Sequence, residues 1–191
     1  TLSLRRLGRR ESDKLVRGII GNTAALTGEI MAEIVERTDG VPLFLEELTK
    51  AVVENAVIGS VPATLHASLM ARLDRLGSAA KEIAQIGAGI GREFSYDLLS
   101  AAARIDEDDM QSALALLEQA DIVYRVGLSP FVRFTFKHVL LRDAIYDSLL
   151  KSKRQQIHAD IAAILKHDFP KLVENQPEVL AHHYQEAGNH E

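Results

Sequence analysis

The chain of 191 residues contains no cysteine. A disulfide framework and a thiolate zinc site are therefore excluded, which fits a reducing compartment such as the cytosol. No apolar run approaches the roughly 20 residues of a membrane-spanning helix, and the N-terminus lacks the apolar stretch of a secretory signal peptide. We therefore predict a cytoplasmic protein that does not enter a membrane.

The motifs of common catalytic sites are also missing. There is no G-x-x-x-x-G-K-[ST] phosphate loop, and the glycines of GAGIG at 87–91 lie within an apolar helical pattern. Small residues in such a pattern favour close helix packing over phosphate binding, which needs a strand-Gly-helix context. No serine or cysteine nucleophile motif is present, and solvated helix faces or helix N-termini explain the carboxylates. We therefore expect that this chain alone is not an enzyme.

The seven histidines do not predict a metal site. His182 and His183 are adjacent, so on a helix their side chains diverge by about 100° and do not both chelate one ion. No spacing typical of zinc ligands links the other candidates, His138, His158, His167 and His190.

The composition, 47% hydrophobic and 26% charged, is typical of a soluble globular protein. The length fits one large domain or two small ones. The net charge is only -5, but the first 20 residues are locally basic. The chain begins at Thr1 rather than at a methionine, and we expect it to be a piece of a longer protein.

Hydrophobic periodicity predicts two helices before residue 40. A short strand is expected at 2–4, followed by a break at 8–12 and a helix with apolar positions at Leu15, Ile19 and Ile20. Thr27 is placed to cap the next helix, in which one face carries Ile30, Ile34 and Val35.

The segment RTDGVPLFLEEL at 37–48 predicts a tight turn between two helices. Gly40 lies where a helix C-terminus commonly needs a left-handed residue. Pro42 suits the first turn of the next helix because its missing N–H has no intrahelical partner there. Turn geometry alone explains both residues as a corner between helices. In the second helix we expect an apolar inner face of Phe44, Leu45, Leu48 and Val52, and an outer face of Glu46, Glu47 and Lys50.

A further helix is expected to open at Pro62, with apolar positions at Leu65, Leu69, Leu73 and Leu76. Gly59 and Ser60 separate it from the preceding helix. A module boundary near residue 60 is therefore predicted.

The rest of the chain predicts three helices, a β-hairpin and further helices. The first three helices are expected at 79–91, 95–103 and 106–120, and the hairpin strands at 122–126 and 131–136. Three helices followed by a two-stranded wing are the order of a winged helix. Amphipathic helices are then expected at 138–150 and 154–166; Pro170 ends that run, and Pro177 opens a last helix that Gly188 closes.

A winged helix suggests DNA, but the charges oppose it. The third helix, which usually enters the DNA groove, is acidic and has no Lys or Arg between 106 and 121. The cations of the wing, Arg125, Arg133 and Lys137, are too few to offset that face. We therefore expect the fold to serve protein or intramolecular docking rather than DNA binding.

Five ordered segments resemble one family: RTDGVPLFLEEL, VPATLHASLMARLDRL, IGREF, FTFKHVLLRDAIYDSLL and LAHHYQEAG. They are similar to the region after the nucleotide-binding core in bacterial signal-transduction ATPases with numerous domains (STAND, related to AAA+), especially the adenylate/guanylate cyclase-like and transcription-activator members. The resemblance implies a mainly α protein. Residues 1–58 would be a helical lid with a remnant of the core, 60–150 a winged helix with a small hairpin, and 151–191 helices leading into tetratricopeptide-like repeats.

The resemblance also implies site residues. Gly40 and Pro42 would lie against the nucleotide base, the glycine by letting the backbone come close and the proline by offering a rigid apolar surface. His138, just after the FTF strand, would reach the ADP phosphates in the parent protein. The segment FKHVLLRDA departs from the Met-His-Asp form of the plant and animal members. A histidine that caps its own helix or packs beside Phe136 is the structural alternative.

The implied function is a regulatory switch. ATP or ADP would bind in the parent, with no cofactor in this fragment alone. The lid and winged helix would pack on the nucleotide-binding core and the repeat domain, and exchange of ADP for ATP would allow self-association. A free-standing helical adaptor for protein binding is the alternative, and a DNA-binding winged helix is less favoured. A phosphate loop upstream in the whole gene product would decide between a switch and an adaptor.

Overall fold

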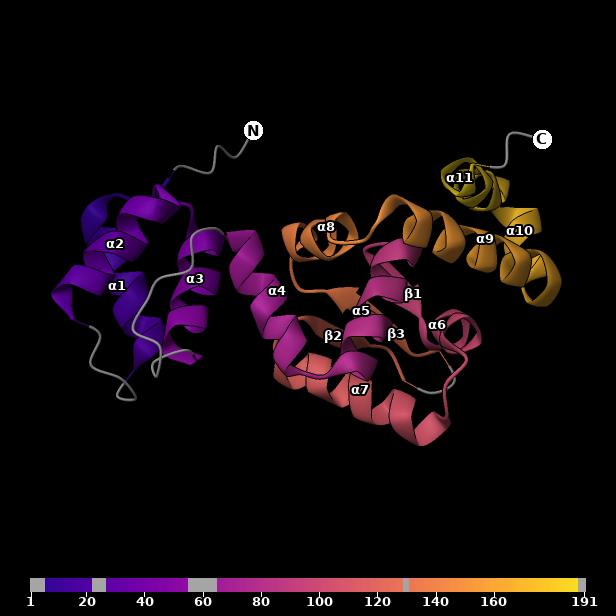
Figure 1. The fold of residues 1–191 in the computed structure, drawn as a ribbon, viewed down its shortest axis with the longest axis horizontal. Helices are drawn as coiled ribbons and strands as arrows, with labels where there is room; N and C mark the ends of the chain where they lie inside the picture. Colours follow the sequence, from indigo (N-terminus) through magenta and orange to yellow (C-terminus); the bar gives the residue numbers. More distant parts are fainter. Residues whose placement is uncertain (1–5, 22–26, 55–64, 129–130, 189–191) are drawn as a thin grey trace. The chain divides into compact units, whose positions relative to one another are not determined.

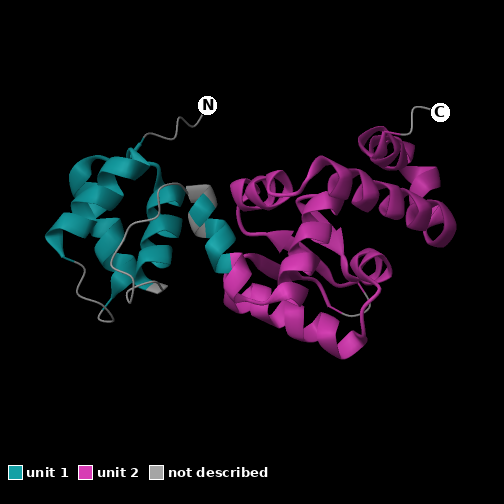
Figure 2. Cartoon of the chain, in the orientation of Figure 1, with its two compact units in different colours: residues 1–72 teal, residues 73–191 magenta. Residues whose placement is uncertain are grey.

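The computed structural model describes residues 6–21, 27–54, 65–128 and 131–188 (Figure 1). The chain forms two compact units, residues 1–72 and residues 73–191 (Figure 2). Within the described residues the fold is mainly helical, with one small three-stranded antiparallel sheet. This confirms the predicted secondary-structure class. The predicted boundary near residue 60, the opening of a helix at Pro62 and the strand at 2–4 lie outside the described residues.

The first unit is built around three helices that bury a common apolar core. The helices are α1 (Arg9–Ile20), α2 (Gly28–Thr38) and α3 (Pro42–Glu54), and α4 (Leu65–Arg75) follows them. The core cluster consists of Val16, Ile20, Met31, Ile34, Leu45, Leu48 and Val52. The Thr27 side chain accepts a hydrogen bond from the Ile30 N–H at 3.4 Å, which confirms the predicted cap of α2.

Two predictions for the first unit are wrong. The break expected at 8–12 is instead the start of α1, where the Glu11 carboxylate accepts a hydrogen bond from the Gly8 N–H at 2.9 Å. Glu47 does not face solvent: its side chain is 1% exposed and lies 3.0 Å from the Arg72 guanidinium, which is 7% exposed. Periodicity assigned Glu47 to the polar face of α3, because the cation that accompanies it comes from a helix later in the chain.

The second unit surrounds the apolar helix α5 (Ser78–Ile90). The elements that follow are β1 (Glu93–Ser95), α6 (Tyr96–Ala103), α7 (Glu107–Gln119), β2 (Val123–Val126), β3 (Arg133–Phe136), α8 (Val139–Asp147), α9 (Lys151–Asp168), α10 (Pro170–Asn175) and α11 (Pro177–Ala187). The helices predicted between 79 and 120 and the hairpin of β2 with β3 are confirmed. Among the described helices, none combines the length and the apolar character needed to cross a membrane.

The sheet has a third strand that the sequence did not predict. β3 is the central strand and pairs antiparallel with both β1 and β2. Phe94 of β1 faces Phe134 of β3 with their ring centroids 6.0 Å apart, and Phe136 lies 5.5 Å from Phe94. These three buried rings fix the sheet against the helices. A three-residue strand is too short to show an alternation of apolar and polar residues. The aromatic residue Phe94 was the only signal of this strand in the sequence.

The glycines of α5 allow close packing, as predicted. A Cβ on Gly87 would lie 2.9 Å from the Phe94 ring, and one on Gly89 would lie 2.6 Å from the Ile157 side chain of α9. Both distances are shorter than an ordinary carbon–carbon contact. The small residues therefore let β1 and α9 approach the helix.

The last three helices share a second apolar core. It contains Leu98, Leu149, Ile157, Ile161, Ile164 and Leu165, with α10 and α11 packed around it. α9 ends at Asp168, before Pro170 as predicted, but the same proline also opens the short helix α10. α11 opens at Pro177 and ends at Gly188 in the left-handed conformation, both as predicted.

Candidate functional site

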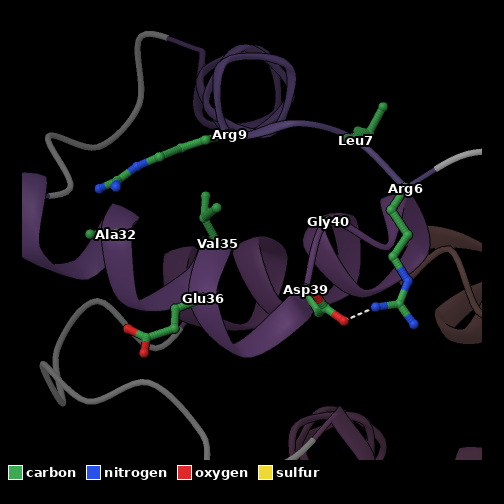
Figure 3. A pocket seen from close by; sticks show the side chains of 8 residues that line it. All are labelled: Arg6, Leu7, Arg9, Ala32, Val35, Glu36, Asp39 and Gly40. Carbon is green, nitrogen blue, oxygen red and sulfur yellow. Dashed lines mark hydrogen bonds and ion pairs between the residues drawn. The ribbon is translucent and has the colours of Figure 1, made fainter.

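A hollow of about 480 Å³ lies beside the Gly40 turn in the first unit (Figure 3). We call it the Gly40 pocket. Its lining residues come from the segment before α1, from α1 and from the end of α2, and they are Arg6, Leu7, Arg9, Ala32, Val35, Glu36, Asp39 and Gly40. Its volume falls in the range of about 300–1,000 Å³ that is typical of small-molecule pockets.

The backbone of Gly40 is held against the segment before α1. The Leu7 N–H donates a hydrogen bond to the Gly40 carbonyl oxygen at 2.8 Å. Gly40 is buried, has a φ of 68°, and a Cβ at this position would lie only 2.2 Å from the Leu7 carbonyl oxygen. Glycine is therefore required both by the left-handed backbone and by the closeness of Leu7. The predicted left-handed turn at Gly40 is confirmed.

Asp39 is also left-handed, with a φ of 47°, and it forms the C-cap of α2. Its carboxylate pairs with Arg6, as the dashed line in Figure 3 shows. Both side chains are exposed, so the pair adds little to stability. The ion pair does place the Arg6 guanidinium at the edge of the pocket. The Asp39 carboxylate also offsets part of the positive charge of Arg6.

Arg9 supplies the second cation of the pocket. It is the first residue of α1, and its extended side chain reaches along the pocket toward Ala32 in Figure 3. Arg9 forms no ion pair with any residue in the described part of the chain. Its guanidinium is thus available to a carboxylate or phosphate group, for which arginine provides a bidentate donor.

The pocket walls combine apolar and charged groups. Leu7, Ala32 and Val35 provide apolar surface, and the Glu36 carboxylate extends to the same side of the view as the Arg9 guanidinium (Figure 3). Such a pocket suits a ligand with an apolar or aromatic body and an anionic group that reaches Arg9.

The structure places only one of the three predicted site residues in this pocket. Pro42 is exposed at the start of α3 and is not part of the pocket wall. His138 belongs to the second unit, where it is the N-cap residue of α8. Its side chain makes no capping hydrogen bond, although its carbonyl oxygen accepts the Leu141 N–H at 3.1 Å. Roles for Pro42 and His138 at a nucleotide remain predictions.

Arg6 and Arg9 are the pocket residues that the sequence did not single out. The locally basic N-terminal end was the available signal. Charge alone did not show which of its arginines share a pocket with Gly40, since that depends on the contact between Leu7 and Gly40.

The first turn of helix α7 presents acidic side chains to solvent. Glu107, Asp108 and Asp109 in its first turn are exposed. Two cations near the hairpin already have acidic partners, because Arg133 contacts Glu93 at 2.8 Å and Lys137 contacts Asp121 at 3.0 Å. The structure therefore supports the predicted electrostatics of this region.

We expect this chain to bind double-stranded DNA no better than about 1–100 μM at physiological salt, the range of non-specific binding. Fluorescence anisotropy with random and genomic duplexes measures this. As a positive control, reversing the charge of Glu107, Asp108 and Asp109 to Lys should increase affinity and its dependence on salt. Sub-micromolar affinity of the unmodified chain with a steep salt dependence would contradict the prediction.

The comparisons with known proteins give one distant relative. No family model matches the chain, and no solved structure matches it. An uncharacterized protein of Rhizobium meliloti (strain 1021) is 28% identical over 165 residues. The alignment covers 78% of this chain but only 16% of that relative, so the chain spans a small part of the relative's length.

Proposed function

We propose that this chain is a regulatory part of a multidomain signal-transduction ATPase of the STAND type. In this role it couples the exchange of ADP for ATP to a rearrangement of domains and to self-association. The first unit acts as the lid of the nucleotide site, and the second contains a winged helix and the helices that lead into a repeat domain. The chain is not itself the catalyst.

The Gly40 pocket is the observation that carries this proposal. It joins a backbone that approaches closely at Gly40, an apolar wall and the available Arg9 guanidinium. An aromatic base against the apolar wall and an anionic phosphate near Arg9 are what these groups suit best. A lid supplies one wall of a nucleotide site, so the phosphate loop would come from the preceding core of the parent.

The order of elements and the size of the relative give further support. Helices α5, α6 and α7 followed by the β2–β3 hairpin are the order of a winged helix, and β1 completes a three-stranded sheet. The pair of helices α9 and α11, packed on each other, is of the kind that stacks in helical repeats. The relative is long enough to hold several more domains.

The decisive experiment measures ADP release from the intact gene product with a fluorescent ADP analogue. Arg9→Ala and His138→Ala should each speed release about tenfold or more, because a charge-assisted hydrogen bond contributes roughly 1.5–3 kcal/mol. Arg17→Ala, on the exposed side of α1 and outside the pocket, is the matched control and should not change the rate.

Assays on the isolated chain test the same proposal independently. It should neither hydrolyse ATP nor bind ATP or ADP with micromolar affinity in calorimetry, because it contains at most one wall of the site. Unchanged ADP release in both variants of the intact protein, or turnover by the chain alone, would overturn the proposal.

A protein-binding adaptor is the second candidate, and one observation favours it. Leu128 and Phe131, on either side of the hairpin tip, are 85% and 80% exposed. Apolar side chains this exposed are common at protein interaction sites. A gene product without a phosphate loop would favour the adaptor over the switch.

A further inference from the structure

A chain of hydrogen bonds, buried at the histidine pair and exposed at Glu186, joins the helices α8, α9 and α11. His158 of α9 and His183 of α11 are each 1% exposed, and their Nδ1 atoms lie 2.7 Å apart. The Nε2 atom of His158 lies 2.9 Å from the Tyr146 hydroxyl of α8. The Tyr146 hydroxyl in turn lies 3.4 Å from the Glu186 carboxylate of α11. The pair thus lies where three helices meet.

One assignment of protons satisfies every contact in this chain. The Nδ1–H of His183 donates to the Nδ1 of His158, the Nε2–H of His158 donates to the Tyr146 oxygen, and the Tyr146 hydroxyl donates to Glu186. Both imidazoles are neutral in this assignment. A metal ion fits poorly between them, because two nitrogens bound to one zinc at about 2.0–2.1 Å each would lie farther apart than 2.7 Å.

Protonation of His158 would replace its acceptor atom with a second N–H donor. Two N–H groups would then face each other at an N···N distance of 2.7 Å, which is a hydrogen-bond distance. Without an acceptor at one of the two nitrogens, such a short contact is repulsive. The contact between α9 and α11 at this point therefore requires that at least one of the facing Nδ1 atoms carries no proton.

The surrounding groups favour the neutral pair. Burial, together with the nearby His158 and His182, lowers the pKa of His183 to about 4. Burial also lowers the pKa of His158; His182 and Arg142 act in the same direction, and only Glu186 opposes them. The guanidinium carbons of Arg142 and Arg154 lie 5.1 Å and 4.8 Å from the centroid of the Tyr146 ring. In the described part of the chain, α5, α6 and α10 contribute no further charge to the pair.

We propose that the neutral His158–His183 pair is a pH-sensitive latch that holds α11 on α9, and that acidification releases α11. The latch rests on the contact between α9 and α11 and does not depend on the proposed nucleotide role. Its sign follows from linkage: a histidine whose pKa is lowered in the docked state takes up a proton on release. Docking is therefore fully stable above the ordinary histidine pKa of about 6.5 and weakens as the pH falls toward 4.

Hydrogen exchange and NMR on this chain test the latch together. Between pH 7 and pH 5, after correction for intrinsic exchange rates, protection of α11 amides should fall on the order of tenfold, while α5 and α7 stay protected. The His183 ring resonances should titrate far below the ordinary range. A His183 that titrates near 6.5, or α11 protection that does not change with pH, would overturn the proposal.

Two variants complete the test. His183→Phe removes one of the two titrating groups and should reduce the loss of α11 protection at pH 5. His167→Ala is the matched control, since His167 is an exposed histidine of α9 that does not act on the pair, and it should leave the pH response in place. If His183→Phe does not dock α11 at all, the NMR titration of the unmodified chain still decides the outcome. If a docked His183→Phe variant loses as much α11 protection at pH 5 as the unmodified chain, the result would contradict the latch.

Discussion

Gly40→Ala is expected to destabilise the first unit by about 3 kcal/mol or more. The left-handed backbone costs a residue with a Cβ roughly 1–2 kcal/mol. The added methyl group also lies 2.2 Å from the Leu7 carbonyl oxygen, so the backbone must move or the Leu7–Gly40 hydrogen bond must break. Hydrogen exchange of α2 and α3 amides is the suitable measurement, because the two units need not unfold together.

Two other glycines of the same unit provide matched controls. Gly21 also has a positive φ, of 54°, but a Cβ there meets nothing within 4 Å. Gly21→Ala should therefore show a backbone cost alone, about 1–3 kcal/mol, because its ψ of -135° lies outside the left-handed helical region. Gly18 lies inside α1 with open space around it, and Gly18→Ala should stabilise by up to about 1 kcal/mol. If Gly40→Ala costs no more than Gly21→Ala, the contact with Leu7 does not require glycine.

Arg72→Met is expected to cost about 3–5 kcal/mol. It removes the cation that faces the buried Glu47 carboxylate at 3.0 Å, and a buried charge that loses its ion-pair partner is strongly unfavourable. Chemical denaturation followed by hydrogen exchange of α3 measures the effect. The double variant Glu47→Leu with Arg72→Met should recover most of the loss, because it removes both charges together.

The exposed pair of Glu33 and Arg37 is the control for Arg72. Its side chains are 42% and 39% exposed at an N···O distance of 2.6 Å, so Arg37→Met should cost less than about 1 kcal/mol. Equal losses at Arg37 and Arg72 would show that burial of the Glu47–Arg72 pair does not set its importance. A double variant no more stable than Arg72→Met would lead to the same conclusion.

The sequence predicted the features that depend on near neighbours. The helices repeat their apolar residues every three or four positions, and Thr27, Gly40 and Gly188 act through atoms of their own turns. Features that depend on distant partners were missed. Glu47 is buried because of Arg72, and β1 is a strand because β3 pairs with it.

The same distinction applies to the candidate site. The left-handed turn at Gly40 was predictable because glycine tolerates that conformation. The pocket was not predictable, because it exists only where the Leu7 segment returns to Gly40 and brings Arg6 and Arg9 with it. The histidine pair was missed for a similar reason: His158 and His183 lie on different helices, so their spacing in the sequence carries no signal.

The order of the strands has a consequence for synthesis on the ribosome. β3 is the central strand, yet it is the last of the three to be translated, so β1 and β2 have no strand partner until residues 133–136 emerge. Helices α5, α6 and α7, whose hydrogen bonds are local, can form before that. During this interval the unpaired edge of β1 and its Phe94 ring are open to contacts with other chains. A ribosome that stalls within α7 should therefore leave the unpaired β1 of the nascent chain accessible to chaperones. Emergence of β3 should end that accessibility.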